Sequence, residues 1–287
     1  MRNPRFLKST NLIGSFRNDS QGQCRQQKKR ISHDKIIAMS ISVLQETINA
    51  NVLRINECIA RACSVVGRHP SEVTLMGVSK THPVEAIRAA YIAGVRHFGE
   101  NRIQEYQQKS LGLKNEPHAV WHFIGHLQSN KALKAVQLFN MIDSVHSLDI
   151  ALKIDRAVTE GFSRIPILLE VRMDEAVTKF GFDVDAVQDG FEILMNMPHL
   201  DIRGLMCIPP FFEDPDQARV FFRGRRNLRD ALIRRFAIPL PTLSMGMSHD
   251  FEVAIEEGST EVRLGTALFG ARLDHHWPQW DTKAAGG

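Results

Sequence analysis

Long hydrophobic runs are absent from this sequence. A membrane-spanning helix needs about 18 to 20 consecutive apolar residues, whereas the most apolar stretches, such as residues 165–171, have the length of a β-strand. Cysteine is also scarce, and its positions show neither a CxxC pair nor zinc-ligand spacing; they are Cys24, Cys58, Cys63 and Cys207. We therefore expect a protein without membrane contacts from a reducing compartment, the cytoplasm.

Most of the chain has no large excess of positive or of negative residues. The formal net charge is +4, but residues 1–36 contain nine lysines and arginines against two aspartates, so the rest of the chain is mildly acidic. Arginines do cluster between Arg219 and Arg235. This cluster has two interpretations: a nucleic-acid-binding surface, or the solvated face of an outer helix. The acidic body favours the solvated face, and we expect no nucleic-acid partner.

Residues 1–38 lack apolar periodicity and are rich in arginine, serine, glutamine and asparagine. Such a segment buries too little surface to offset its ordering entropy, so we expect a disordered basic extension. It could be an organelle transit peptide, a basic nucleic-acid arm or an upstream extension from a misassigned start. Met39 directly precedes good helical sequence, which favours the third interpretation.

The remaining chain alternates between helical and strand-like patterns. Apolar residues recur at three- and four-residue steps from Ile41 to Val66, which predicts an amphipathic helix with Ser42 and Gln45 as its capping box. Short apolar runs then alternate with helical stretches. The eight expected strands span residues 73–79, 96–101, 121–125, 141–145, 165–171, 203–208, 242–246 and 261–270.

Eight β units in regular alternation predict an α/β protein with a single closed (β/α)₈ TIM barrel. We expect the barrel in residues 39–274, with the helix after Met39 as an extra N-terminal helix and residues 275–287 as a flexible tail. An open doubly wound sheet is the alternative, but it would carry a glycine-rich phosphate turn after the first strand. This sequence has Ser79 and Lys80 there.

Lys80 closes the first strand, and reactive groups in such barrels lie where strands end. Desolvation beside an apolar wall lowers the pKa of a lysine and makes its amine a nucleophile that can form a Schiff base with an aldehyde. A strand-end lysine in water is the other interpretation, and composition alone favours it.

Polar residues also follow the second and third strands. Glu100 and Asn101 are expected at the same rim, and His122 and His126 flank the end of the third strand. The two histidines are four residues apart, as zinc ligands on a helix can be. Because they straddle a strand end they do not share a face, and no third ligand is evident. We therefore expect no metal site.

Small residues gather at the ends of the seventh and eighth strands, which is the usual phosphate site of these barrels. Glycine lets the backbone approach a phosphate, and serine and threonine hydroxyls can surround it; ordinary turn chemistry is the alternative. Arg263 should point into the barrel mouth, toward a carboxylate or the ring nitrogen of a cofactor. The small residues are Ser244, Gly246, Ser248, Gly265 and Thr266.

Several ordered motifs together resemble a known family. They are GVSKT (77–81), FGENRIQE (98–105), WHFIGHLQSNK (121–131), GLM followed by IP (204–209) and SMGMSHDFEVAIEEGSTEVRLGTALFG (244–270). The chain from about residue 40 to about residue 272 is similar to the pyridoxal phosphate homeostasis proteins (the YggS/PROSC family), which are alanine-racemase-like. The residues before Met39 lie outside this resemblance.

The resemblance implies a fold-type III barrel that holds pyridoxal 5′-phosphate (PLP), with no second β domain. Lys80 then forms the Schiff base, and Arg263 matches the family's arginine at the pyridine nitrogen. Asn101 matches a residue near the cofactor. The implied phosphate contacts are Ser244, Gly265 and Thr266, with Gly246 and Ser248.

The expected function is PLP homeostasis rather than catalysis. We expect a monomer that hands PLP to PLP-dependent apoenzymes. PLP is a good electron sink when its ring nitrogen is protonated, and an arginine does not give up that proton. Two-base racemization also needs a second acid/base, which in alanine racemases is a tyrosine from a separate β domain. This chain has only Tyr91 and Tyr106, both in early helical segments. An amino-acid racemase is the alternative.

Overall fold

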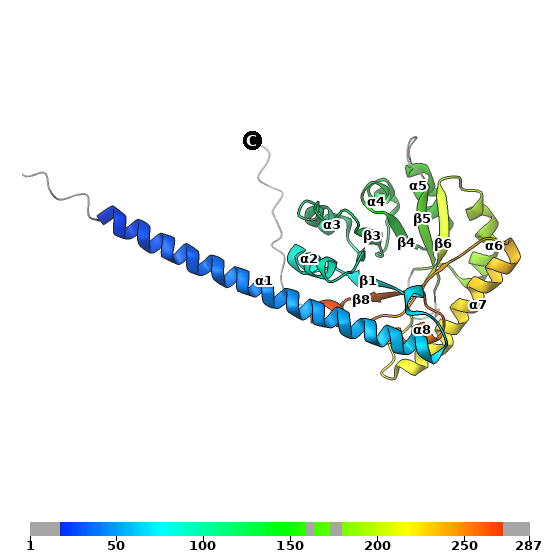
Figure 1. Cartoon of the computed structure of the whole chain (residues 1–287). Helices are drawn as coiled ribbons and strands as arrows, with labels where there is room; N and C mark the ends of the chain where they lie inside the picture. The colour runs from blue at the N-terminus through cyan, green and yellow to red at the C-terminus, as the bar shows by residue number, and fades with distance from the viewer. Residues whose placement is uncertain (1–17, 159–163, 173–179, 272–287) are drawn as a thin grey trace, which may run out of the picture. The chain divides into compact units, whose positions relative to one another are not determined.

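A computed structural model describes residues 18–158, 164–172 and 180–271, with side chains from residue 39 onward. Eight parallel strands form a closed barrel in chain order, and β8 is hydrogen-bonded back to β1 (Figure 1). They are β1 (Thr74–Val78), β2 (His97–Glu100), β3 (Val120–Phe123), β4 (Met141–Val145), β5 (Ile165–Glu170), β6 (Leu200–Met206), β7 (Thr242–Ser244) and β8 (Glu261–Leu264). The predicted (β/α)₈ barrel is confirmed, and the open sheet is excluded.

Helices alternate with the strands along the chain. They are α1 (Asn18–Val65), α2 (Val84–Ile92), α3 (Ile103–Ser110), α4 (Ala132–Leu138), α5 (Leu148–Ala157), α6 (Val184–Met195), α7 (Arg219–Phe236), α8 (Phe251–Glu256) and α9 (Thr266–Phe269), with short 3₁₀ turns at Pro70–Glu72, Ser129–Lys131 and Pro215–Ala218. Residues 1–46 and 47–287 form two compact units, and the barrel lies in the second. From residue 47 onward, α1 buries Ile48, Val52, Ile55 and Ile59, which confirms the predicted periodicity.

The structure differs from the sequence prediction at two helix boundaries. Helix α1 begins at Asn18 rather than after Met39, and the hydroxyl of Ser42 donates to Glu46 within the helix instead of capping its start. The eighth strand ends at Leu264, because Gly265 turns the chain into α9. The expected domain limits at Met39 and residue 274 stay predictions, and residues 1–17 and 272–287 lie outside the described residues.

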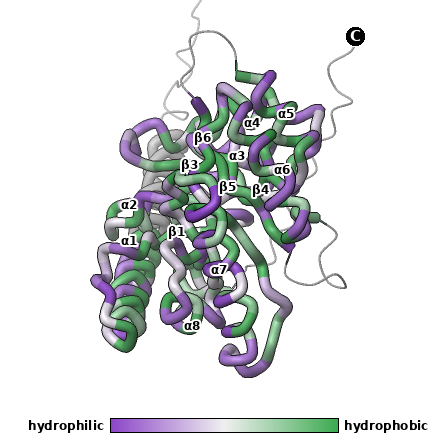
Figure 2. The backbone as a smooth tube through the Cα atoms, turned by 90° about the vertical axis from the view of Figure 1, so that its right-hand side faces the viewer, coloured by the Kyte–Doolittle hydropathy of each residue, from purple (hydrophilic) through white to green (hydrophobic). Residues whose placement is uncertain are grey.

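Strand residues alternate between the barrel interior and the helix layer. A Cβ at Gly77 would meet Leu268 and Phe269 of α9, so this position of β1 faces outward and its neighbour Met76 faces inward. Met141, Leu168 and Met206 form a buried apolar cluster. Helices such as α5 and α6 alternate between hydrophobic and hydrophilic segments (Figure 2), as expected for helices with one face on a core.

No helix among the described residues combines the length and hydrophobicity that crossing a membrane requires. The amphipathic helices around the barrel instead bury one stripe and expose the other.

The ring of strands is paired unevenly. Strands β5 and β6 pair at six positions, whereas β7 and β8 pair only at Ser244 and Glu261. The Ser259 hydroxyl lies 2.7 Å from the carbonyl oxygen of Met245 and 2.9 Å from that of Glu261. Three backbone hydrogen bonds also join the two segments, from the amides of Thr260, Met245 and Arg263 to the carbonyls of Leu243, Glu261 and Gly246. The junction is therefore held by irregular backbone and side-chain hydrogen bonds rather than by a regular ladder.

Gly204 offers a direct test of the packing between β6 and β7. Its φ is +153°, and a Cβ there would lie 1.7 Å from the carbonyl oxygen of Thr242. We expect Gly204→Ala to lower the free energy of unfolding by about 3 kcal/mol or more, since the two strands must separate to accept the methyl group. Urea denaturation measures this change.

Gly224 in α7 is the matched control, because a Cβ there meets nothing within 4 Å. Replacing a glycine inside a helix by alanine typically adds about 0.5–1 kcal/mol of stability. If Gly204→Ala were as stable as Gly224→Ala, the close approach of β6 and β7 would be disproved.

Candidate functional site

The residues predicted to bind a cofactor lie at the carboxyl ends of four adjacent strands. Strand β7 pairs with β8, β8 with β1, and β1 with β2. Ser244, Gly246 and Ser248 end or follow β7, Arg263, Gly265 and Thr266 end or follow β8, Lys80 follows β1 and Asn101 follows β2. The barrel therefore brings together residues that lie far apart in the sequence, as expected for a site built on strand ends.

Lys80 lies in the turn between β1 and α2 and is half-buried. Its neighbours are held firmly on both sides. The amide of Ser79 donates to the carbonyl of Gly99 at 3.0 Å, and the amide of Thr81 donates to Glu105 Oε1 at 2.6 Å. Thr81 has φ +67°, a left-handed conformation that a β-branched residue rarely adopts. Contacts with β2 and α3 thus fix the direction in which Lys80 leaves the strand.

A buried ion-pair network lies directly behind this turn. The ammonium of Lys109 donates to the carbonyl of Ser79 at 2.8 Å, to Glu100 Oε1 at 2.8 Å and to Glu105 Oε1 at 2.6 Å. The Ser79 hydroxyl also donates to Glu100 Oε1, at 2.7 Å. Burial raises the pKa of Glu100, and the charge of Lys109 opposes that rise. The network, which we name the Lys109 network (Lys109, Glu100, Glu105 and Ser79), supports the Lys80 turn.

Sequence reasoning missed this network. The α3 sequence is polar, so Lys109 and Glu105 resemble a solvated i,i+4 pair. Glu100 was expected at the rim beside Asn101, but its side chain is fully buried against Lys109. Only Asn101 remains at the strand end, half-buried and with its backbone against Gly125. The placement of Glu100 at the rim was therefore wrong, because the alternation along β2 points it toward the helix layer.

The loops after β7 and β8 contact one another. The amide of Ala267 donates to the Ser248 hydroxyl at 3.2 Å, and the amide of Arg263 donates to the carbonyl of Gly246 at 3.0 Å. Gly246 has φ +95° and a Cβ there would lie 2.6 Å from Ala254, so only glycine fits. A Cβ at Gly265 would lie 3.7 Å from Val78, on the strand that ends beside Lys80.

Arg263 points into the barrel, as predicted, and is 4% exposed. Its Nη1 donates to the Ser244 hydroxyl at 2.8 Å and its Nη2 donates to the carbonyl of Cys207 at 2.9 Å. Both acceptors are neutral. Hydrogen bonds to neutral groups therefore fix the orientation of the guanidinium group. Ser244 is fully buried and touches Arg263, whereas Ser248 lies in the loop.

The two histidines of the third strand end lie in different surroundings, as predicted. His122 is buried inside the barrel, where it contacts His97 and Asp143. His126 is exposed, and its ring stacks on Phe180 at 3.6 Å and lies 4.5 Å from the ring of His146.

The arginines of α7 are largely paired with acids. Arg219 donates to Asp216 and Glu256, and Arg223 donates to Glu257 at 2.7 and 3.0 Å. These contacts use the guanidinium groups of Arg219 and Arg223 within the fold. The absence of a nucleic-acid partner stays a prediction.

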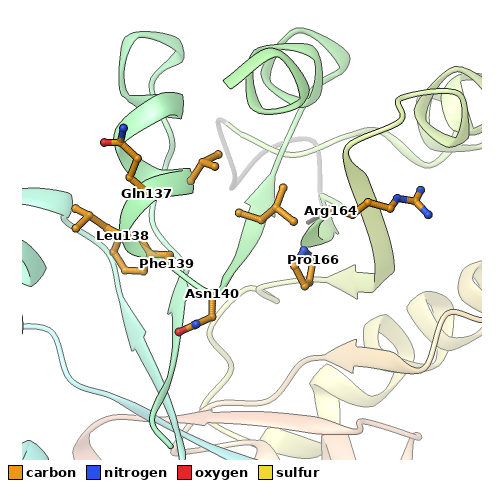
Figure 3. Close-up of a pocket in the computed structure, with 8 residues that line it drawn as sticks. Gln137, Leu138, Phe139, Asn140, Arg164 and Pro166 are labelled. Atoms are coloured by element: carbon orange, nitrogen blue, oxygen red, sulfur yellow. The ribbon is translucent and has the colours of Figure 1, made fainter. Parts of the chain in front are cut away.

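A pocket of about 310 Å³ lies at the opposite end of the barrel (Figure 3). Residues 136–140 and 164–166 line it, at the end of α4 and the starts of β4 and β5. Its lining includes one charged side chain, Arg164, and none of the predicted site residues. The convergent polar groups that mark a cofactor site are at the Lys80 end instead.

Comparison with known proteins gives consistent matches. Residues 55–273 match the family model described as alanine racemase, N-terminal domain. A protein of Aquifex aeolicus named pyridoxal phosphate homeostasis protein is 43% identical over 222 residues, which cover 76% of this chain and 96% of that protein. A protein of Escherichia coli K12 with the same name is 36% identical over 234 residues, covering 77% and 95%.

Solved structures agree with these matches. PipY of Synechococcus elongatus, whose structure was solved with PLP bound, is 39% identical with a TM-score of 0.66 and covers 74% of this chain and 100% of PipY. An alanine racemase of Corynebacterium glutamicum is 18% identical with a TM-score of 0.59, covering 81% of this chain and 63% of the racemase. The second likeness shows the fold alone.

Proposed function

We propose that this chain, which belongs to the family of pyridoxal phosphate homeostasis proteins, binds pyridoxal 5′-phosphate through Lys80 and controls its free concentration. The observation that carries this proposal is the gathering of Lys80, Arg263 and the β7 and β8 loops at one end of the barrel. PipY, a relative at 39% identity, has PLP bound. When bound, the cofactor supplies a reactive aldehyde for a lysine amine.

The donor set fits such a cofactor. Lys80 offers an amine for covalent attachment, and Arg263 offers a directed charge for the ring nitrogen. Gly246 and Gly265 let the backbone approach a phosphate closely, and Ser248 and Thr266 add hydroxyls. Asn101 lies on the other side of Lys80, at the end of β2. Ser244, through its contact with Arg263, orients the guanidinium rather than reaching the loop.

The same residues argue for a carrier rather than a racemase. An arginine side chain is a hydrogen-bond donor and not a general acid, so a ring nitrogen that faces Arg263 accepts a hydrogen bond and is not protonated by it. Tyr106 is buried between Trp121 and Phe139 on the outside of the barrel, and burial raises its pKa. Tyr91 contacts Arg96 on α2. Neither tyrosine is placed to act as a second base at the barrel mouth.

Reduction of the loaded protein tests the proposal. The full chain is mixed with PLP, treated with borohydride, digested and examined by mass spectrometry. We expect one reduced label per chain, on the peptide that contains Lys80. A label spread over surface lysines, or none, would overturn the assignment.

Turnover tests the alternative enzyme function. The loaded chain is incubated with L-alanine, and D-alanine is measured by chiral chromatography beside a Lys80→Ala chain. We expect no difference between the two. Production of D-alanine that requires Lys80 would instead establish a racemase.

The proposed function also includes an oligomeric state, a location and a route for the bound PLP. We propose that the protein acts as a monomer in the cytoplasm and releases PLP to PLP-dependent apoenzymes. The reversibility of attachment through a lysine amine supports such a transfer. Gel filtration of the full chain checks the oligomeric state.

A further inference from the structure

Four titratable side chains meet inside the barrel, at its amino-terminal end and away from Lys80. His97 opens β2, Glu261 opens β8, and His122 and Asp143 lie on β3 and β4. His97 Nδ1 lies 2.9 Å from His122 Nε2, and His122 Nδ1 lies 3.0 Å from Asp143 Oδ2. One ligand atom from each of His97, His122 and Glu261 lies within 4.8 Å of the others. We name these three residues the His–His–Glu cluster.

The cluster contains a polar atom without a partner. Glu261 is 4% exposed, and its Oε1 has no hydrogen-bond partner among the described residues. Burying a carboxylate oxygen without a hydrogen-bond donor destabilises the folded protein. A bound cation that accepts an electron pair from this oxygen would remove that cost.

We propose that the His–His–Glu cluster is a binding site for one divalent transition-metal ion such as Zn²⁺, with His97 Nδ1, His122 Nε2 and Glu261 Oε1 as its ligands. Two imidazoles and one carboxylate are a common protein ligand set for zinc, with a fourth position left for water. The same donor types also suit other first-row divalent ions.

The distances need only small adjustments to accept an ion. Ligand atoms at about 2.0–2.2 Å from a tetrahedral zinc are about 3.3–3.5 Å from one another. The two imidazole nitrogens, now at 2.9 Å, must separate slightly, and a carboxylate oxygen of Glu261 already lies within 4.8 Å of both. Because the three residues come from β2, β3 and β8, the ion would tie together strands on both sides of β1.

Asp143 supplies the outer support that such sites require. Metal-bound histidines typically donate their second ring N–H to a carboxylate, which fixes the tautomer. His122 Nδ1 has this arrangement with both oxygens of Asp143, at 3.1 and 3.0 Å. A divalent ion with Asp143, Glu261 and two neutral imidazoles also has no net charge, which suits a buried cluster.

His97 is the member of the cluster nearest to solvent. It is half-buried and also lines a pocket of about 300 Å³ at the amino ends of β1 and β2, at the end of the barrel opposite Lys80.

Equilibrium dialysis of the full chain against Zn²⁺, with a thiol-free reductant present, tests the site. We expect about one tightly held zinc ion per chain, with or without PLP. His97→Gln and Glu261→Gln should each weaken binding at least about tenfold, and Asp143→Asn about 10- to 100-fold. Circular dichroism checks that each variant is folded.

The pair His126 and His146 provides the matched control, because it is a histidine pair outside the cluster, with one exposed and one half-buried ring. A His126→Ala/His146→Ala chain should keep the ion. Visible absorption of the Co²⁺-loaded wild-type chain gives a readout that needs no variant, and we expect the bands of a nitrogen- and oxygen-ligated tetrahedral ion. Absence of a stoichiometric ion, or loss of that ion in the control chain alone, would overturn the proposal.

Discussion

A Lys80→Ala chain is expected to lose all borohydride-stable PLP while keeping its fold. The lysine amine is the attachment group proposed here, and no other lysine lies in the turn after β1. The side chain is only half-buried at the barrel mouth, so its removal should change the free energy of unfolding by less than about 1 kcal/mol. Absorbance before and after borohydride, together with a thermal melt, measures both effects.

The exposed Lys114 provides the matched control. Lys114→Ala should bind PLP with the same visible band and the same loss of that band on reduction. If the Lys80→Ala chain kept the band and the reduced label, attachment would occur elsewhere and the proposed site would be wrong.

Lys109→Met should be the most destabilising single change in the site region. The side chains of Lys109 and Glu100 are 2% and 0% exposed and their charges lie 2.8 Å apart. Removing one member of a buried ion pair leaves an uncompensated charge and typically costs about 3–5 kcal/mol. The change also removes the donor to the Ser79 carbonyl, so PLP affinity should fall as the Lys80 turn loosens. Urea denaturation and PLP titration measure the two effects.

The destabilisation in Lys109→Met should grow as the pH rises. Burial already raises the pKa of Glu100 above its ordinary value of 4.5, and loss of Lys109 removes the charge that opposes this rise. A raised folded-state pKa favours the protonated carboxyl in the folded protein, so the variant is relatively more stable at low pH and loses stability as Glu100 ionises. A second change, Glu100→Gln, should restore part of the loss. Equal stability of Lys109→Met and the exposed Lys114→Met would contradict this account.

Much of the fold could be predicted because local patterns reflect it. Each of the eight predicted ranges overlaps a strand of the barrel, since parallel strands buried on both faces have continuous apolar sequences, although β3 and β6 begin one and three residues before the predicted ranges. The eighth run was predicted too long because Thr266–Phe269 is as apolar as the strand before it, and only Gly265 marks the change to helix. The start of α1 was missed because its early residues have little apolar periodicity.

The polar interior could not be predicted because it depends on register between distant strands. His122 was recognised as a buried or rim histidine, but its partners His97 and Glu261 lie on β2 and β8 and meet it only in the closed ring. The burial of Lys109 depends in the same way on how α3 packs against β2, and a polar helix sequence does not reveal it. A signal was present in Glu261, an acid at the first position of a strand that is buried throughout.

The short junction between β7 and β8 bears on how long a bound cofactor stays. Proteins open locally at their least supported elements, well before they unfold as a whole. This junction has one regularly paired position and three irregular backbone hydrogen bonds, against six paired positions between β5 and β6, and the loops proposed to hold the phosphate emerge from the same two strands. Local opening there would spread the loops while the well-paired β5 and β6 remain closed. The residence time of the cofactor would then be set by the rate of local opening and not by the rate of global unfolding. The cofactor could leave quickly although the barrel as a whole unfolds slowly.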